Sequence, residues 1–251
     1  MKISSIRLLL FCSALGCGLA DIATAREPIK IDLESMVLSR FVWRGEVWTG
    51  DPVFWQTAAL RYRGFRAWNF FNMDLTAING DRYELNEHDY ILDYTYTFRY
   101  FSLAPGVLHF SSPTGFFPSS TKITLDVKTT LPLHPRLRLR VDPKETRGSY
   151  YIFSLAQRVS PYRGAPAVDL YASLGVSEPR YYRKRLGGNL TFTDALLGVS
   201  VPVEVGKGFT LTPFVELTSL LDHSVREAQR DTGAGKDMAT WAVMLNRGIE
   251  F

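Results

Sequence analysis

Apolar and polar residues alternate along most of this chain, and few stretches keep the 3.6-residue period of a helix. Ile123, Leu125 and Val127, for example, are interleaved with lysine, threonine and aspartate. Successive side chains of a strand point to opposite faces, so this pattern predicts strands with one apolar and one polar face. In a water-soluble sandwich the apolar face would point inward. In a membrane barrel it points to lipid, and the polar face lines the interior.

Segments with this pattern follow one another from residue 31 to residue 251. The predicted strands are 31–43, 53–62, 65–76, 87–99, 104–110, 121–130, 136–141, 149–159, 167–176, 190–201, 209–219 and 239–251. An even number of about twelve strands suits a single-chain bacterial barrel. The sequence therefore predicts an all-β fold, a transmembrane antiparallel up-and-down β-barrel, with a soluble periplasmic sandwich as the alternative.

The connections between these strands differ in length from one side of the barrel to the other. The predicted inside turns are 63–64, 101–103, 131–135, 160–166 and 202–208, and the predicted outside loops include 78–86, 111–120, 178–189 and 220–238. The second set is mostly longer and more polar. Short periplasmic turns with longer extracellular loops are the asymmetry expected of an outer-membrane barrel.

The N-terminal segment has the layout of a secretory signal peptide. Lys2 and Arg7 precede an apolar run over 8–19, and Ala23-Thr24-Ala25 offers a small-x-small cleavage site. The run is short of the ~20 residues of a transmembrane helix, which disfavours an uncleaved anchor. We therefore expect a signal peptide over 1–25 and one barrel domain over 26–251.

Composition narrows the function classes. Both cysteines, Cys12 and Cys17, lie in the leader, so the mature chain would have no disulfide, zinc–thiolate site or thiol catalysis. Lipoprotein processing at Cys17 is disfavoured because the leucine expected three residues earlier is absent. The excess of 29 Lys+Arg over 25 Asp+Glu is small and dispersed, so it does not indicate nucleic-acid binding. The sequence implies no cofactor.

The last predicted strand ends on an aromatic residue. Phe251 follows a face formed by Trp241, Val243, Leu245 and Ile249, which Arg247 interrupts. This ending resembles the signal read by the bacterial barrel-assembly machinery, so outer-membrane lipid and that machinery are the expected partners. Aromatic residues also gather near other strand ends, where membrane barrels carry girdles: Phe41, Trp43, Trp55, Tyr62, Phe65, Trp68, Tyr100 and Phe101.

The first predicted hairpin resembles a known family. The stretch Ser39-Arg40-Phe41-Val42-Trp43-Arg44-Gly45, followed by Pro52, Gln56, Gly64-Phe65 and Trp68, is similar to the opening of the TorF-type porins. Glu87-His88-Asp89-Tyr90 also looks like the acidic pair that follows in that family, and Asn69 and Phe70 depart from its small residues. The resemblance covers about the first third of the mature chain and implies an outer-membrane pore without naming a solute.

Charged residues recur on single faces of the predicted strands. Arg40 and Arg44 would share a face with Asp32 and Glu34, and Arg136, Arg138 and Arg140 form a second row. The acidic residues expected to oppose them are Asp89, Asp93, Asp126 and Glu216. These side chains would set the ion preference of a pore for small polar solutes or ions, or they would pair with one another and fill a narrow barrel.

Two further functions remain open from the sequence. A closed barrel could serve as a structural protein or bind a partner through its outer loops. A lipid or ester hydrolase at the rim would use His109 and Ser111, which share a strand face, although no third catalytic partner is visible.

Overall fold

A computed structural model describes residues 28–43, 46–78, 80–115, 118–162, 164–178, 190–229 and 235–251. The expected signal peptide lies outside these residues. Within the described part, no helix is long and apolar enough to cross a membrane.

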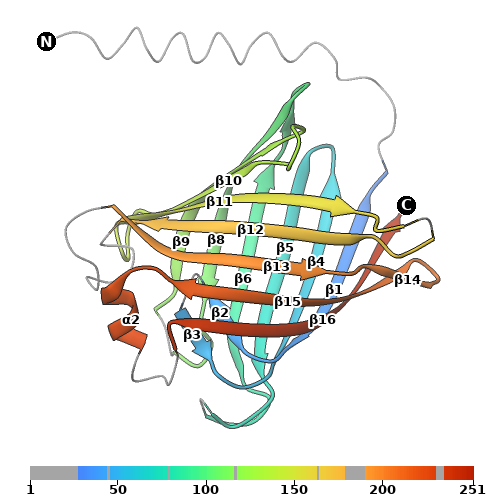
Figure 1. The fold of residues 1–251 in the computed structure, drawn as a ribbon. Helices are drawn as coiled ribbons and strands as arrows, with labels where there is room; N and C mark the ends of the chain where they lie inside the picture. The colour runs from blue at the N-terminus through green and yellow to red at the C-terminus, as the bar shows by residue number, and fades with distance from the viewer. Residues whose placement is uncertain are drawn as a thin grey trace, which may run out of the picture.

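The chain folds into one closed β-barrel of 12 antiparallel strands, as the sequence predicts. The barrel strands are β1 (Lys30–Leu38), β4 (Val53–Tyr62), β5 (Phe65–Asp74), β6 (Leu85–Tyr94), β8 (Phe101–Ser111), β9 (Ser120–Thr129), β10 (Arg136–Asp142), β11 (Gly148–Val159), β12 (Val168–Ser177), β13 (Thr191–Ser200), β15 (Phe209–Leu220) and β16 (Asp237–Glu250). Neighbours in the chain are neighbours in the sheet, and β1 pairs with β16 to close it (Figure 1).

Four short strands and one short helix accompany these strands in the described part of the chain. β7 (Tyr96–Thr97) extends the sheet beside β8, and β14 (Val203–Gly206) extends it beside β15. β2 (Phe41–Trp43) and β3 (Glu46–Thr49) pair with each other in a sheet of their own. A short helix, α2 (His223–Gln229), follows β15.

The alternation in the sequence becomes an inner and an outer face. Directly paired residues of neighbouring strands share a face, and β6 and β8 pair Ile91 with Leu108 and Leu92 with Val107. Ile91 and Leu108 are buried, whereas Leu92 and Val107 are about half exposed. The same contrast recurs around the barrel, with exposed apolar side chains outside, as expected where the solvent is lipid.

The connections follow the predicted asymmetry. Lys30 pairs with Glu250, so the first and last strands reach the same end of the barrel. At that end the two-residue turn Arg63-Gly64 joins β4 to β5, and both residues have positive φ, 48° and 83°. Two positive φ values are typical of a type I′ turn, whose twist suits a tight hairpin. We refer to this end as periplasmic and to the opposite end as extracellular.

The first predicted strand, 31–43, is too long. β1 ends at Leu38, and the chain bends at Ser39-Arg40 before β2. The Ser39 amide still donates to the Trp241 carbonyl at 2.9 Å, so the chain leaves the ladder directly after this residue. Phe41, two residues further along the chain, is only 1% exposed. The alternation of apolar and polar residues continues through the bend, so this alternation alone did not reveal that the chain turns inward.

Candidate functional site

The hairpin of β2 and β3, called the inner hairpin from here on, lies inside the extracellular half of the barrel. Val42 and Val47 pack against a cluster formed by strands on one side of the wall and α2, with the members Tyr150, Leu220, Val225 and Met238. Phe41 is buried in a second cluster with residues of β1, β4 and β16: Met36, Leu38, Val53 and Ala242. Figure 1 shows β2 and β3 near α2, away from the C-terminus.

Aromatic rings connect the inner hairpin to the opposite wall. The Phe41 ring meets the Trp55 ring of β4 edge-on with centroids 5.0 Å apart, and Trp55 in turn meets Phe70 of β5 at 5.2 Å. Trp48 meets Phe110 of β8 at 5.8 Å, also edge-on. Edge-to-face pairs at these separations are attractive beyond the area they bury. The inner hairpin therefore contacts several sides of the barrel in its extracellular half.

Polar contacts at the root of the inner hairpin are buried. Thr49 Oγ1 donates to Asp74 Oδ1 at 3.0 Å, and the same carboxylate oxygen accepts from Asn86 Nδ2 at 2.7 Å. In the described part of the chain, neither β2 nor β3 has ladder pairing with a barrel strand. Side chains rather than the backbone ladder hold this hairpin in place.

A row of three arginines lines the inner face of β10 beside the inner hairpin. At its periplasmic end Arg136 Nε donates to Asp126 Oδ1 at 2.8 Å, and its Nη2 donates to Oδ2. At its extracellular end the Arg140 guanidinium lies over the Trp43 ring, 4.8 Å from the centroid. Between them, Arg138 Nε is buried and has no hydrogen-bond partner among the described residues. The three guanidinium groups thus have three different environments.

Further ion pairs line the periplasmic half of the inner face. Arg66 binds Asp93 through two of its guanidinium nitrogens, at 2.5 Å for Nη2 and 3.0 Å for Nε, and Asp93 is 5% exposed. Arg158 holds Asp169 in a two-point contact at 2.6 and 2.7 Å, although the arginine is largely exposed. Two more pairs lie close to the rim, Arg61 with Asp32 and Lys30 with Glu250.

The remaining predicted site residues do not gather at one place in the barrel. Arg40 lies in the bend after β1, so it does not share a strand face with Asp32 and Glu34 as expected. Arg44 lies outside the described residues. Asp89 is buried on the inner face of β6, between Phe70 and Phe110. Glu216 accepts a hydrogen bond from the Tyr171 hydroxyl at 2.9 Å.

Phe251 is exposed beside the closing seam of the barrel, and its amide donates to the Ile29 carbonyl at 2.9 Å.

The inner hairpin is the main feature that the sequence interpretation missed. A signal was present, because Arg44-Gly45 separates two short runs of aromatic and β-branched residues, Phe41-Val42-Trp43 and Val47-Trp48-Thr49. Such runs around a glycine-containing turn indicate a hairpin. Strand alternation through residue 43 masked this signal.

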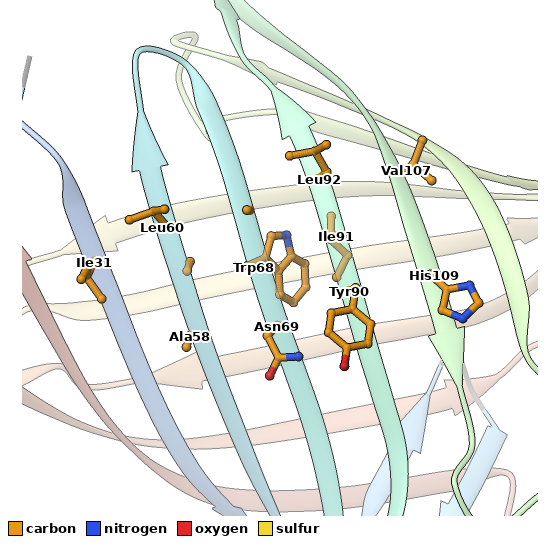
Figure 2. A pocket seen from close by; sticks show the side chains of 12 residues that line it. Ile31, Ala58, Leu60, Trp68, Asn69, Tyr90, Ile91, Leu92, Val107 and His109 are labelled. Atoms are coloured by element: carbon orange, nitrogen blue, oxygen red, sulfur yellow. The ribbon is translucent and has the colours of Figure 1, made fainter.

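The outer face carries an open groove of about 630 Å³ across β1, β4, β5, β6 and β8. Small and apolar side chains line most of it, including Ala58, Leu60 and Ala67, whereas Asn69, Tyr90 and His109 add polar groups. Figure 2 shows Tyr90 and His109 on neighbouring strands of this face. These polar groups interact with outer-face neighbours: Asn69 Nδ2 donates to His88 Nε2 at 2.6 Å, and His109 Nδ1 shares a hydrogen bond with Thr121 Oγ1 at 3.0 Å.

The same face contains the residues of the hydrolase alternative. Ser111 Oγ donates to the His88 carbonyl at 2.7 Å, and the His109 ring is bonded to Thr121. Among the described residues Ser111 and His109 do not form the serine–histidine hydrogen bond that nucleophilic hydrolysis requires. The geometry therefore does not favour an enzyme at this position.

Solved structures of outer-membrane barrels are similar to this fold. A KdgM porin matches with a TM-score of 0.51 and 13% identity over 87% of this chain and 98% of that chain. A KdgM porin in complex with disordered oligogalacturonate matches with a TM-score of 0.50, also at 13% identity and over the same shares. No protein-family model and no curated protein sequence matches the chain. The likeness shows that this chain has the closed β-barrel fold of these outer-membrane porins.

Proposed function

We propose that this protein is a porin-type pore for small polar solutes, that its inner face favours anions, and that the inner hairpin sets its aperture. The observation that carries the proposal is the arginine row on the inner face of a closed barrel. The buried Arg138 Nε in this row has no hydrogen-bond acceptor among the described residues. A charged group in a confined interior creates a local field that selects permeating ions.

The arginine row differs from the other charges of the inner face. Arg66, Arg158 and Arg61 each bind one aspartate, so these pairs fill space and contribute little net field. On β9 and β10, by contrast, the inner face carries five basic residues, Lys122, Lys128, Arg136, Arg138 and Arg140, against two acidic ones, Asp126 and Asp142. Positive charge therefore exceeds negative charge on this side of the barrel, which supports a preference for anions.

The arginine row on β10 also indicates which class of solute the pore would favour. Carboxylates and phosphates match the fork of donors that a guanidinium presents. The structurally similar KdgM porin has been captured with oligogalacturonate, a chain of carboxylate-bearing sugars. Short sugar acids are therefore the first solutes to test on this protein.

Two further parts of the proposal concern the protein family and the assembly of the barrel in the membrane. The opening residues Arg40 to Gly45 support membership of the TorF-type porin family. The exposed Phe251 at the seam supports recognition of the last strand by the barrel-assembly machinery.

The pore is tested by recording single-channel currents from protein purified from outer membranes and inserted into planar bilayers. Heat-shifted gel mobility of the same sample shows that the barrel is folded. We expect stepwise conductance, with a reversal potential in a salt gradient that indicates anion preference. A reversal potential indicating cation preference would contradict the proposed role of the arginines.

The second candidate function is a closed barrel that binds a partner through its outer loops. The inner hairpin favours it, because three clusters of buried side chains surround this hairpin in the extracellular half. Folded protein that stays silent even after the inner hairpin is removed would exclude the pore and leave this alternative to be tested by partner binding.

A further inference from the structure

We propose that Arg138, Arg140 and Trp43 form a binding site for a carboxylate-bearing solute, and that filling this site releases the inner hairpin from the barrel wall. This inference rests on the proposed pore function and adds how the solute opens the pore.

The inner hairpin can move without breaking the barrel. β2 and β3 pair with each other and not with any described barrel strand, so their displacement leaves the closed ladder intact. A two-stranded hairpin alone is marginally stable in water. Its position therefore depends on side-chain contacts with the wall, and a change in those contacts changes the fraction of time it occupies the interior.

The contact with β10 differs in kind from the others. Phe41, Trp48 and Val42 contact apolar or aromatic side chains, which no small polar solute can replace. Trp43 also packs against the cluster around Phe41, but in addition it contacts a charged group, the Arg140 guanidinium at 4.8 Å from its ring. A dissolved anion can compete for that guanidinium, because charge-assisted hydrogen bonds are stronger than an average cation–π contact.

Arg138 makes the site specific for an anion. It occupies the next inner-face position of β10 toward the periplasmic end, about 7 Å along the strand from Arg140, because each residue of a strand advances ~3.3 Å. Its buried Nε lacks a hydrogen-bond partner in the described part of the chain, which is costly for a charged group. Arg136 provides the contrast, since its Nε and Nη2 atoms both donate to Asp126.

A carboxylate bound between the Arg138 and Arg140 guanidinium groups would affect both the unpartnered Arg138 Nε and the contact of Arg140 with Trp43. One oxygen would accept from Arg138 and supply its missing partner, while the other would draw the Arg140 guanidinium away from the Trp43 ring. A solute that binds only the state in which Trp43 is released shifts the population toward that state. Trp43 then loses its contact with β10, and the inner hairpin leaves the wall on that side.

The experiment measures open probability with glucuronate and with glucose, two solutes of similar size that differ in charge. We expect glucuronate to raise the open probability of the wild-type protein and glucose to leave it unchanged. In Arg138→Gln, glucuronate should no longer raise the open probability, so the ratio of open probability with and without glucuronate should fall to one. Arg158→Gln is the matched control, because it removes an inner-face arginine outside the site, and it should keep the wild-type response.

Trp43→Leu tests the release step. It removes the cation–π contact, so we expect about a tenfold higher open probability without any anion, as such a contact shifts a two-state equilibrium by roughly that factor. A response to glucuronate in Arg138→Gln equal to that of the wild type, or equal responses to glucuronate and glucose, would overturn the inference.

A variant with residues 40–50 replaced by a short glycine–serine linker separates the two levels of the proposal. If this folded barrel conducts but the wild-type protein ignores glucuronate, the gating site is refuted and the pore stands. If this folded barrel is silent, the pore function itself is refuted.

Discussion

Tyr171 and Glu216 are linked across an intervening strand. The Tyr171 hydroxyl on β12 donates to Glu216 Oε1 on β15 at 2.9 Å, and β13 lies between them. The link passes directly over Gly198, where a Cβ atom would lie 2.2 Å from the Tyr171 ring. The absence of a side chain on β13 thus allows this inner-face hydrogen bond.

Gly198→Ala should therefore destabilise the barrel. The added methyl group must displace the Tyr171 ring and break its bond to Glu216, which we expect to cost about 3 kcal/mol through overpacking and a lost partner for a partly buried carboxylate. Urea titration of the folded barrel in lipid vesicles, followed by tryptophan fluorescence, measures this loss. Gly248→Ala is the control, because its Cβ would meet only Asp32 Oδ1, at 3.8 Å. Equal effects of the two substitutions would contradict this account.

Two carboxylates that each bind an arginine should differ in their importance for stability. Asp93 is buried and receives two donors from Arg66, whereas the Arg158–Asp169 pair is largely exposed. Asp93→Asn leaves a partly buried arginine with a neutral partner, and we expect a loss of about 3 kcal/mol. Asp169→Asn should cost less than about 1 kcal/mol. The same urea titration compares them, and a larger loss for Asp169→Asn would exclude the burial argument.

The β10 arginines should control ion selectivity as a group. Replacing Arg136, Arg138 and Arg140 by glutamine removes three positive charges from one side of the inner face, so the permeability ratio of anions to cations should fall. Reversal potentials in a salt gradient measure the ratio. The double variant Arg158→Gln/Asp169→Asn should change it little, because it removes both charges of a pair that is neutral in the folded protein. An unchanged ratio in the triple variant would mean that the row has no role in selectivity.

Much of the fold was predictable because one rule covers all twelve strands. A barrel strand must alternate between lipid and the interior, so the alternation predicts the strand and both of its faces at once. The prediction was less accurate at strand ends. Alternation continues past Tyr94 to Tyr100, for instance, yet β6 ends at Tyr94 and Thr95 donates to the Gly64 carbonyl. Turns of this kind depend on contacts between distant residues.

The candidate site was less predictable than the fold. The sequence places three arginines on one face of β10, but it does not say that Arg136 binds Asp126 while Arg140 contacts Trp43. That distinction arises because the inner hairpin brings Trp43 to β10 from a distant part of the chain. The meaning of a charged residue inside a barrel therefore depends on tertiary contacts that strand periodicity does not encode.

The outer face gives the last prediction, because Leu197 on β13 is 63% exposed and lies where lipid is expected. Leu197→Arg should cost ~2–4 kcal/mol in a bilayer, the penalty for an arginine facing lipid near the midplane. Thr57→Arg is the matched control, since Thr57 pairs with Glu34 on the inner face and the new guanidinium would meet an opposite charge. Folding yields in vesicles, measured by heat-shifted gel mobility, should fall sharply for the first variant and little for the second. A reversed order would mean that the inner and outer faces are assigned the wrong way round.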